Sequence, residues 1–452
     1  MKRLLSALAI ATTMQVTASE APKNIIMVIS DGMGPAYTTA YRYFNDDPAT
    51  PEIEQTVFDK YHVGSSSTYP AKVSGLVTDS AASATALAAG VKSYNGAIGV
   101  DVNEKPVKSV LHKAQSLGFK TGVVVTSQIN HATPASYLAH NVNRRNYDAI
   151  ADSYIDDRNN GQFITDLMLG GGWTYFIRDD RNIVDEFKQA GFHYVDNFEQ
   201  VTALPKDKPV LGLFGDKGMD QALDHQDKHR LATMTSSALN HLKNDKGMFL
   251  LVEASQVDWG GHANDIAWSM TEMSDLDKTM QVLETFVEQN PETLVVLTAD
   301  HSTGGMTIGA NGKYAWFPTW IKNLTASTET MSKDIAKTGL DFERLAHQLG
   351  FQLNDEEVVT LKESMSGAQS YWQSNQEKLT EKGYTKESTV ARQMRKAITK
   401  LIDKRTNTGW TTGGHTGVDV PVYAFGKGAS VFNGKQDNTD IAKHIFKMLA
   451  SQ

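Results

Sequence analysis

The sequence predicts an α/β protein with a central, mostly parallel β-sheet sandwiched between helices and carrying a helical insertion. Short apolar, β-branched runs alternate with longer helical patterns, as expected for parallel strands joined by covering helices. Several of these runs lead directly into polar or acidic residues, which is typical of strands that end at a ligand site. Residues 320–409 differ, because they are rich in Lys, Glu, Gln and Ser and show helical patterns without strands.

The expected strands are short and apolar, and the expected helices have apolar residues three and four positions apart. In open α/β sheets, ligands bind beyond the carboxyl ends of the strands, so the polar residues that follow these strands should meet in one crevice. The expected strands are Ile25–Ile29, Gly122–Thr126, Met248–Val252, Thr293–Thr298 and Val420–Ala424. The expected helices are Pro35–Phe44, Ser80–Ala89, Val107–Leu117, Asp180–Ala190, His229–Lys243, His262–Glu288 and Asp440–Leu449.

Residues 320–409 are expected to form a helical insertion within one catalytic domain that covers residues 19–452. The alternative is a further set of helices that cover the sheet, and composition alone does not decide between the two. The helical patterns lie at Leu340–Leu349, Asp355–Ser364, Gln369–Leu379 and Thr389–Ile402.

The first residues predict an exported protein. Two cations precede an apolar run, and small residues end at Ala18, as in a secretory signal peptide that covers residues 1–18. A buried first helix is the alternative. No later run approaches the roughly 20 apolar residues that a membrane-spanning helix needs. We therefore expect a periplasmic or secreted protein with no membrane partner.

Composition restricts both the partners and the metal ligands. The chain has 52 acidic and 44 basic residues and a net charge of −8, which becomes −10 when residues 1–18 are removed. An acidic surface disfavours nucleic acid as a partner. An anionic substrate would need a locally positive site, which bound dications can provide. Cysteine is absent, so histidine and carboxylate remain as the metal ligands.

The most informative segment is Thr78–Ala86, which places Ser80 at the start of an Ala-rich helix. The amino end of a helix presents unpaired N–H groups and attracts anions, including a phosphoryl group. The alternative is that Ser80 only caps the helix. Carboxylates and histidines elsewhere in the chain favour a metal-activated nucleophile instead.

Three further segments carry candidate metal ligands: two combine carboxylate and histidine after predicted strands, and the third offers a histidine just before the expected strand at Val420. Asp258 and His262 are four positions apart, so on a helix or tight turn they share one face and can bind one metal. Asp300 and His301 follow a buried strand, where a structural ion pair is the alternative. His415 stands between glycines that allow close approach to an ion.

Two other segments complete the candidate site. Asp31 lies at a strand end before glycine, where a plain turn would explain it equally well. His131 opens the run His-Ala-Thr-Pro, and Arg144 follows soon after. A guanidinium can hold two phosphate oxygens at once. On chemistry alone, Arg145 would serve as well as Arg144.

Together these segments resemble the alkaline phosphatase family. One motif would be modest support, but seven in the same order are highly specific. They run between Ile25 and Gly426 and are Asp31–Gly34, Thr78–Ala86, His131–Pro134, Glu253–Asp258, His262, Thr298–His301 and Gly414–Gly417.

The resemblance implies a hydrolase that releases phosphate from varied phosphate monoesters, as a homodimer. Ser80 would form a phosphoserine intermediate, and Arg144, at the family's distance from Thr133, would hold the phosphoryl group. Two metals roughly 4 Å apart can stabilise the entering and leaving oxygens of an in-line displacement. The implied ligands are Asp258, His262 and His415 for one Zn²⁺, Asp31, Asp300 and His301 for a second, and Asp31, Thr133 and Glu253 for one Mg²⁺.

Two positions depart from the best-known bacterial pattern. His131 stands where many members have aspartate, and Trp259 stands where they have lysine. We expect both beside the metals or the substrate, with Trp259 either packing or touching substrate. His301 and His415 are 114 positions apart, more than in compact members. The insertion between them is expected to cap the site or embrace a second subunit.

Three other functions are possible for a chain with these motifs: a related hydrolase, a binding protein and an adhesive protein. A related two-metal enzyme could cleave phosphodiesters or sulfate esters. The serine nucleophile and an arginine suited to a terminal phosphate argue against diesters, and a Cys/Ser-x-Pro-x-Arg signature for sulfatases is absent. An exported binding protein without catalysis, or an adhesive protein, would not need all of these strand-end motifs.

Overall fold

The computed structural model describes residues 21–452, so the predicted signal peptide lies outside the described residues. Ten strands form one sheet, in the order β14-β2-β13-β8-β1-β7-β3-β4-β6-β5. All neighbours in this sheet are parallel except β13, which runs antiparallel to β8 and to β2. The mostly parallel sheet is therefore confirmed. The strands are β1 (Asn24–Ser30), β2 (His62–Ser67), β3 (Lys120–Gln128), β4 (Leu167–Gly171), β5 (His193–Val195), β6 (Val210–Leu213), β7 (Met248–Ala254), β8 (Thr293–Thr298), β13 (Val420–Gly426) and β14 (Gly434–Asp437).

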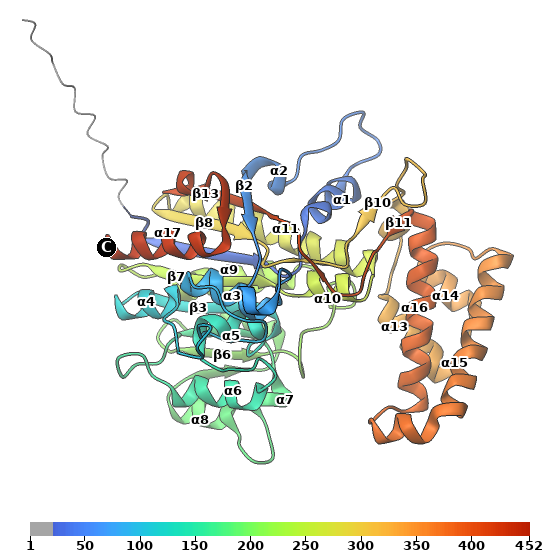
Figure 1. Ribbon diagram of the computed structural model, residues 1–452, viewed down its shortest axis with the longest axis horizontal. Helices are drawn as coiled ribbons and strands as arrows, with labels where there is room; N and C mark the ends of the chain where they lie inside the picture. Colours follow the sequence, from blue (N-terminus) through green and yellow to red (C-terminus); the bar gives the residue numbers. More distant parts are fainter. Residues whose placement is uncertain (1–20) are drawn as a thin grey trace, which may run out of the picture.

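Helices cover both faces of this sheet (Figure 1). Alternate residues of β1 point to opposite faces: Ile25 and Met27 join one apolar core, and Ile26 and Val28 join the other. One core is covered by α3 (Ser80–Ala89), α4 (Val110–Ser116), α5 (Ala132–Leu138), α6 (Tyr147–Asp156), α8 (Ile183–Gln189) and α17 (Asn438–Ala450). The other is covered by α1 (Pro35–Asn45), α2 (Val57–Tyr61), α9 (Arg230–Leu242) and α11 (Ile266–Gln289).

The five expected strands are all present, but β2, β4, β5, β6 and β14 were not predicted. Several of these have polar or glycine-rich sequences, such as HVGSSS in β2 and GKQD in β14, which carry no apolar strand signal. The expected helix His262–Glu288 is wrong at its start. A short helix, α10 (Gln256–His262), ends there, and Asp265 caps α11 by accepting the N–H of Trp268 at 3.0 Å.

Within residues 320–409, α13 (Thr328–Thr338), α14 (Phe342–Leu349), α15 (Asp355–Glu381) and α16 (Lys386–Thr406) pack together. Figure 1 shows them at one end of the molecule, on the side where α10 lies. The two helical patterns at 355–379 form one helix. The expected absence of strands is also wrong, because β11 (Thr408–Gly409) pairs with β10 (Thr307–Ile308) at the base of the insertion.

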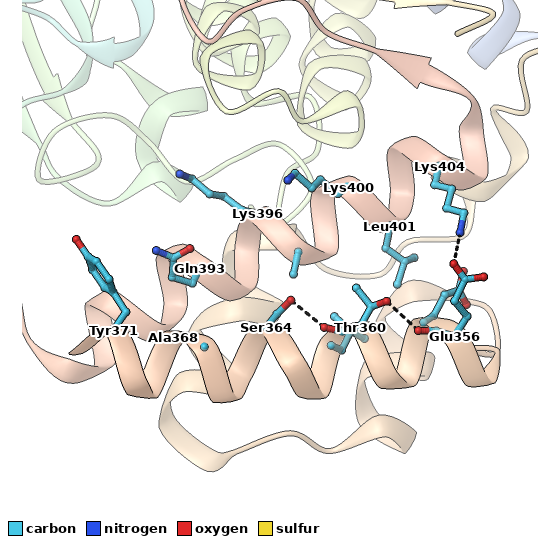
Figure 2. A pocket seen from close by; sticks show the side chains of 14 residues that line it. Glu356, Thr360, Ser364, Ala368, Tyr371, Gln393, Lys396, Lys400, Leu401 and Lys404 are labelled. Atoms are coloured by element: carbon cyan, nitrogen blue, oxygen red, sulfur yellow. Dashed lines mark hydrogen bonds and ion pairs between the residues drawn. The ribbon is translucent and has the colours of Figure 1, made fainter. Parts of the chain in front are cut away.

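A hollow of about 550 Å³ lies along one side of the packed helices α15 and α16, and its lining includes Thr360 and Ala368 of α15 and Lys396 and Lys400 of α16 (Figure 2). It contains none of the predicted site residues, which lie instead at one edge of the sheet. Among residues 21–452, no helix combines the length and the apolar character needed to cross a bilayer.

Candidate active site

The carboxyl ends of four adjacent parallel strands bring the predicted residues together. β8, β1, β7 and β3 are neighbours in this order; Asp300 follows β8, Asp31 follows β1, Glu253 lies near the end of β7, and His131 follows β3. The backbone at Gly32, with φ of 74°, passes close to Asp258. A Cβ at Gly32 would lie 2.8 Å from the Cα of Asp258, so the turn after β1 needs a glycine.

Ser80 is the first residue of α3, and Asp79 is its N-cap, accepting the N–H of Ala82 at 3.0 Å. The alternative in which Ser80 only caps the helix is therefore wrong. Ser80 is buried, and its Oγ lies 3.2 Å from Nε2 of His301. The hydroxyl thus lies at the positive end of a helix and beside a candidate metal ligand.

The first candidate metal group consists of Asp258, His262 and His415, whose ligand atoms all lie within 4.8 Å of one another. Nε2 of His262 is 3.3 Å from Oδ2 of Asp258 and 3.2 Å from Nε2 of His415. The Nδ1 atoms point away, toward the backbone oxygens of Gly413 at 2.7 Å and of Thr78 at 2.9 Å. Such contacts orient both imidazoles with Nε2 free to bind an ion.

A second group lies around His301. Its Nε2 is 3.4 Å from Oδ1 of Asp31 and 3.2 Å from Oδ2 of Asp300. Asp31, Asp258 and His301 also form a set of ligand atoms within 4.8 Å, so Asp258 lies between the two groups. Thr303 was not predicted; its Oγ1 donates to Asp258 and lies 3.2 Å from Nδ1 of His301. Its position two residues after His301 was the available signal.

A third group combines Asp31, His131 and Glu253. Oε2 of Glu253 accepts the hydroxyl of Ser255 at 2.7 Å, whereas Oε1 has no hydrogen-bond partner among residues 21–452. The same holds for both carboxylate oxygens of Asp31, for Oδ2 of Asp300 and for Oγ1 of Thr133. Buried oxygens without partners are costly. Oxygen-rich sets of this kind fit hard cations, and the histidine groups fit zinc.

The electrostatics of these groups also fit cations. Burial, and repulsion from Asp258, raise the pKa of Asp300 to about 7, and burial raises that of Glu253 to about 7. Burial and three neighbouring carboxylates raise the pKa of Asp31 well above its ordinary value. Burial lowers the pKa of His301 well below its ordinary value, so its imidazole is neutral and able to bind a metal.

Arg144 lies against the start of α3. Its Nη1 donates to Oδ2 of Asp79 at 3.0 Å, and its Nη2 is 3.3 Å from Nε2 of His131. Burial and Arg144 lower the pKa of His131 to about 3, so this histidine adds no positive charge. Arg145, in contrast, is exposed. The geometry therefore favours Arg144 as the anion-binding arginine beside Ser80.

The indole of Trp259 packs against His131 and Gly218. Its ring lies 6.1 Å from that of His131 at an interplanar angle of 81°. A Cβ on Gly218 would lie 2.5 Å from the indole, so the absence of a side chain there makes room for Trp259. The indole is nevertheless part of the wall next to His131.

Comparison with known proteins agrees with this geometry. The sequence model of alkaline phosphatases matches residues 22–451. The chain belongs to the alkaline phosphatase family. Alkaline phosphatase members bind metal and hydrolyse phosphate monoesters, and this chain is an enzyme of that class, as the resemblance in its motifs predicted.

Individual alkaline phosphatases are similar over nearly their whole length. Alkaline phosphatase 3 of Bacillus subtilis is 44% identical over 429 residues, which cover 94% of this chain and 89% of that protein. A cold-active alkaline phosphatase from Shewanella sp. superposes with a TM-score of 0.85 and 43% identity over 94% and 99% of the two chains. The enzyme of the Antarctic bacterium TAB5 follows with a TM-score of 0.67 and 26% identity over 95% and 98%.

Proposed function

We propose that this enzyme hydrolyses phosphate monoesters by way of a phosphoserine on Ser80, and that bound dications are its cofactors. The observation that supports it best is the position of the Ser80 hydroxyl. It lies at the amino end of α3, 3.2 Å from His301 and next to Arg144, at the edge of three groups of candidate ligands.

The donor sets fit two zinc ions and one magnesium ion. Asp258, His262 and His415 would hold one zinc, and Asp31, Asp300 and His301 the second. Asp31, Thr133 and Glu253 would hold magnesium, and a His-to-Asp variant of the TAB5 enzyme has been solved with magnesium bound. When bound, these ions supply positive charge that lowers the pKa of nearby hydroxyls and stabilises entering and leaving oxygens.

The residues of the chain then divide the work of two displacements. In the first, Oγ of Ser80 loses its proton and bonds to phosphorus, the ester P–O bond breaks, and the alkoxide leaves with the bonding electrons and takes up a proton to become the alcohol. Arg144 and the N–H groups at the start of α3 hold the non-bridging oxygens during this step. In the second, a water oxygen loses a proton and bonds to phosphorus, the bond to Ser80 breaks, and Oγ of Ser80 regains a proton. Two inversions give net retention at phosphorus.

The cellular location, domain organisation and oligomeric state of the enzyme are also proposals. We infer that residues 1–18 direct export to the periplasm or medium, and that residues 19–452 form one catalytic domain. We also infer a homodimer in which residues 320–409 cap the site or embrace the second subunit. The position of α13–α16 at the α10 side of the sheet supports such a role (Figure 1).

A substrate panel tests the proposed reaction. We expect rapid hydrolysis of a nitrophenyl phosphate, and turnover lower by at least about 100-fold for the bis-ester and the sulfate ester, because Arg144 suits a terminal phosphate. Release of nitrophenolate measures all three. Preference for the bis-ester or the sulfate would instead assign the protein to the related two-metal enzymes.

Arg144 and its exposed neighbour form a matched pair of variants. Arg144→Ala should lower kcat/KM for a monoester by roughly 10- to 100-fold, because it removes a charged hydrogen-bonding partner of the phosphoryl group. Arg145→Ala should leave kcat/KM within about twofold of the parent. Steady-state kinetics decide, and equal losses in both variants would contradict the assignment.

A further inference from the structure

Trp410 connects the insertion to the candidate metal groups. It follows β11, at the point where the chain leaves α16 and turns toward His415. Its Nε1–H donates to Oδ1 of Asp403, in the last turn of α16, at 3.2 Å. Its ring lies against Gly304, where a Cβ would be only 2.6 Å from Cε3 of the indole. One side chain therefore touches both the insertion and the loop that follows His301.

The loop that begins at Trp410 carries His415 and is tied to two other segments with candidate zinc ligands, the one after His301 and the one that ends at His262. The N–H of Gly304 donates to the oxygen of Gly414 at 2.9 Å, and β12 (His415–Thr416) pairs with β9 (Ser302–Thr303). Farther along the same loop, the oxygen of Gly413 contacts Nδ1 of His262 at 2.7 Å. A shift of this loop would therefore move His415 and, at the same time, remove the contact that orients the imidazole of His262.

We propose that Trp410 is a positioning residue for the zinc ligands His262 and His415, and that Asp403 of the insertion holds it in place. This inference rests on the proposed metal cofactors. Loss of a hydrogen-bond partner of a metal ligand commonly lowers the affinity for the metal by 10- to 100-fold. For His262 the partner is the backbone oxygen of Gly413, and His415 itself follows in the same loop. The residue that fixes this loop therefore takes over that role.

Asp403 is suited to hold an indole N–H. Among residues 21–452, Trp410 is the one hydrogen-bond donor to its carboxyl group. Asp265, at the start of α11, is the nearby charged group, and it is itself bonded by Thr328 and by the N–H of Trp268. The hydrogen bond from Trp410 is therefore the direct link between the carboxyl group of Asp403 and the loop that carries His415.

The test measures how quickly a colour-forming chelator removes zinc from the purified holoenzyme. Trp410→Phe keeps an aromatic ring against Gly304 and removes the Nε1–H. Asp403→Leu removes the acceptor, whereas Asp403→Asn keeps an acceptor oxygen. We expect zinc release at least about tenfold faster in the first two variants and near the parental rate in Asp403→Asn.

Trp316 supplies the matched control. Its Nε1–H donates to Oγ1 of Thr408 at 2.9 Å, also at the base of the insertion, but it has no such contact with Gly304. Trp316→Phe should release zinc at the parental rate while lowering Tm about as much as Trp410→Phe. Equal rates of release in all variants, or equal acceleration in Trp316→Phe, would overturn the inference. A parent enzyme that binds no zinc would instead refute the proposed cofactors.

Discussion

Replacing Ser80 with alanine is expected to lower kcat for a phosphate monoester by roughly 10⁴-fold or more. Loss of the nucleophile from a catalytic unit has effects of this size, because the remaining members then act without the group they serve. Arg144 and the candidate ligands stay in place, so substrate binding should change far less than turnover. Nitrophenolate release at saturating substrate measures the loss.

A serine on the same helix provides the control for this variant. Ser83 is also buried on α3, and its hydroxyl donates to the backbone oxygen of Asp300 at 2.7 Å. Ser83→Ala should lose this hydrogen bond and the one that the hydroxyl accepts from Asn438 at 3.1 Å, reduce kcat less than about tenfold, and keep the parental metal content. If Ser80→Ala turns over substrate normally, Ser80 is not the nucleophile.

Removing the metals is expected to abolish activity and to make stability depend on pH with a defined sign. Folding raises the pKa of Asp300 and Glu253 to about 7 from ordinary values near 4. Without metal, the folded protein therefore binds these protons more tightly than the unfolded chain does. Its free energy of unfolding should be highest in acid and should fall as the pH rises through about 7.

Bound dications should reverse this dependence, because they bind the deprotonated carboxylates. The difference in Tm between metal-loaded and chelator-treated protein should widen from pH 5 to pH 8, and added Zn²⁺ and Mg²⁺ should restore activity. Differential scanning calorimetry at both pH values provides the measurement. A difference that narrows toward pH 8 would contradict cation binding by Asp31, Asp300 and Glu253.

The sequence predicted the centre of the sheet better than its edges, for physical reasons. β1, β7 and β8 are buried on both faces, so they are continuous apolar runs that stand out in the sequence. At one edge, β2 and β14 are polar, and hydrogen bonding to a neighbour rather than composition makes them strands. The expected helix began at His262, four residues too early, because a single residue, the N-cap Asp265, sets the start of α11.

For the site, the sequence supplied the ligands but not the residues that orient them. Asp258 and His262 are close in sequence, and Asp31 and Asp300 directly or closely follow predicted strands. Thr303 and Trp410 act through contacts with residues far away in the chain or with backbone atoms, and such contacts leave no pattern in the sequence. Only the folded arrangement reveals them.

The most direct test of the account is the covalent state of Ser80 during turnover. The enzyme should be mixed with a phosphate monoester, quenched in acid, digested and examined by mass spectrometry, with Ser80→Ala treated in parallel. The account predicts one added phosphoryl group on the peptide that contains Ser80 and none on that peptide in the variant. A phosphoryl group on another residue, or rapid turnover without any labelled peptide, would contradict it.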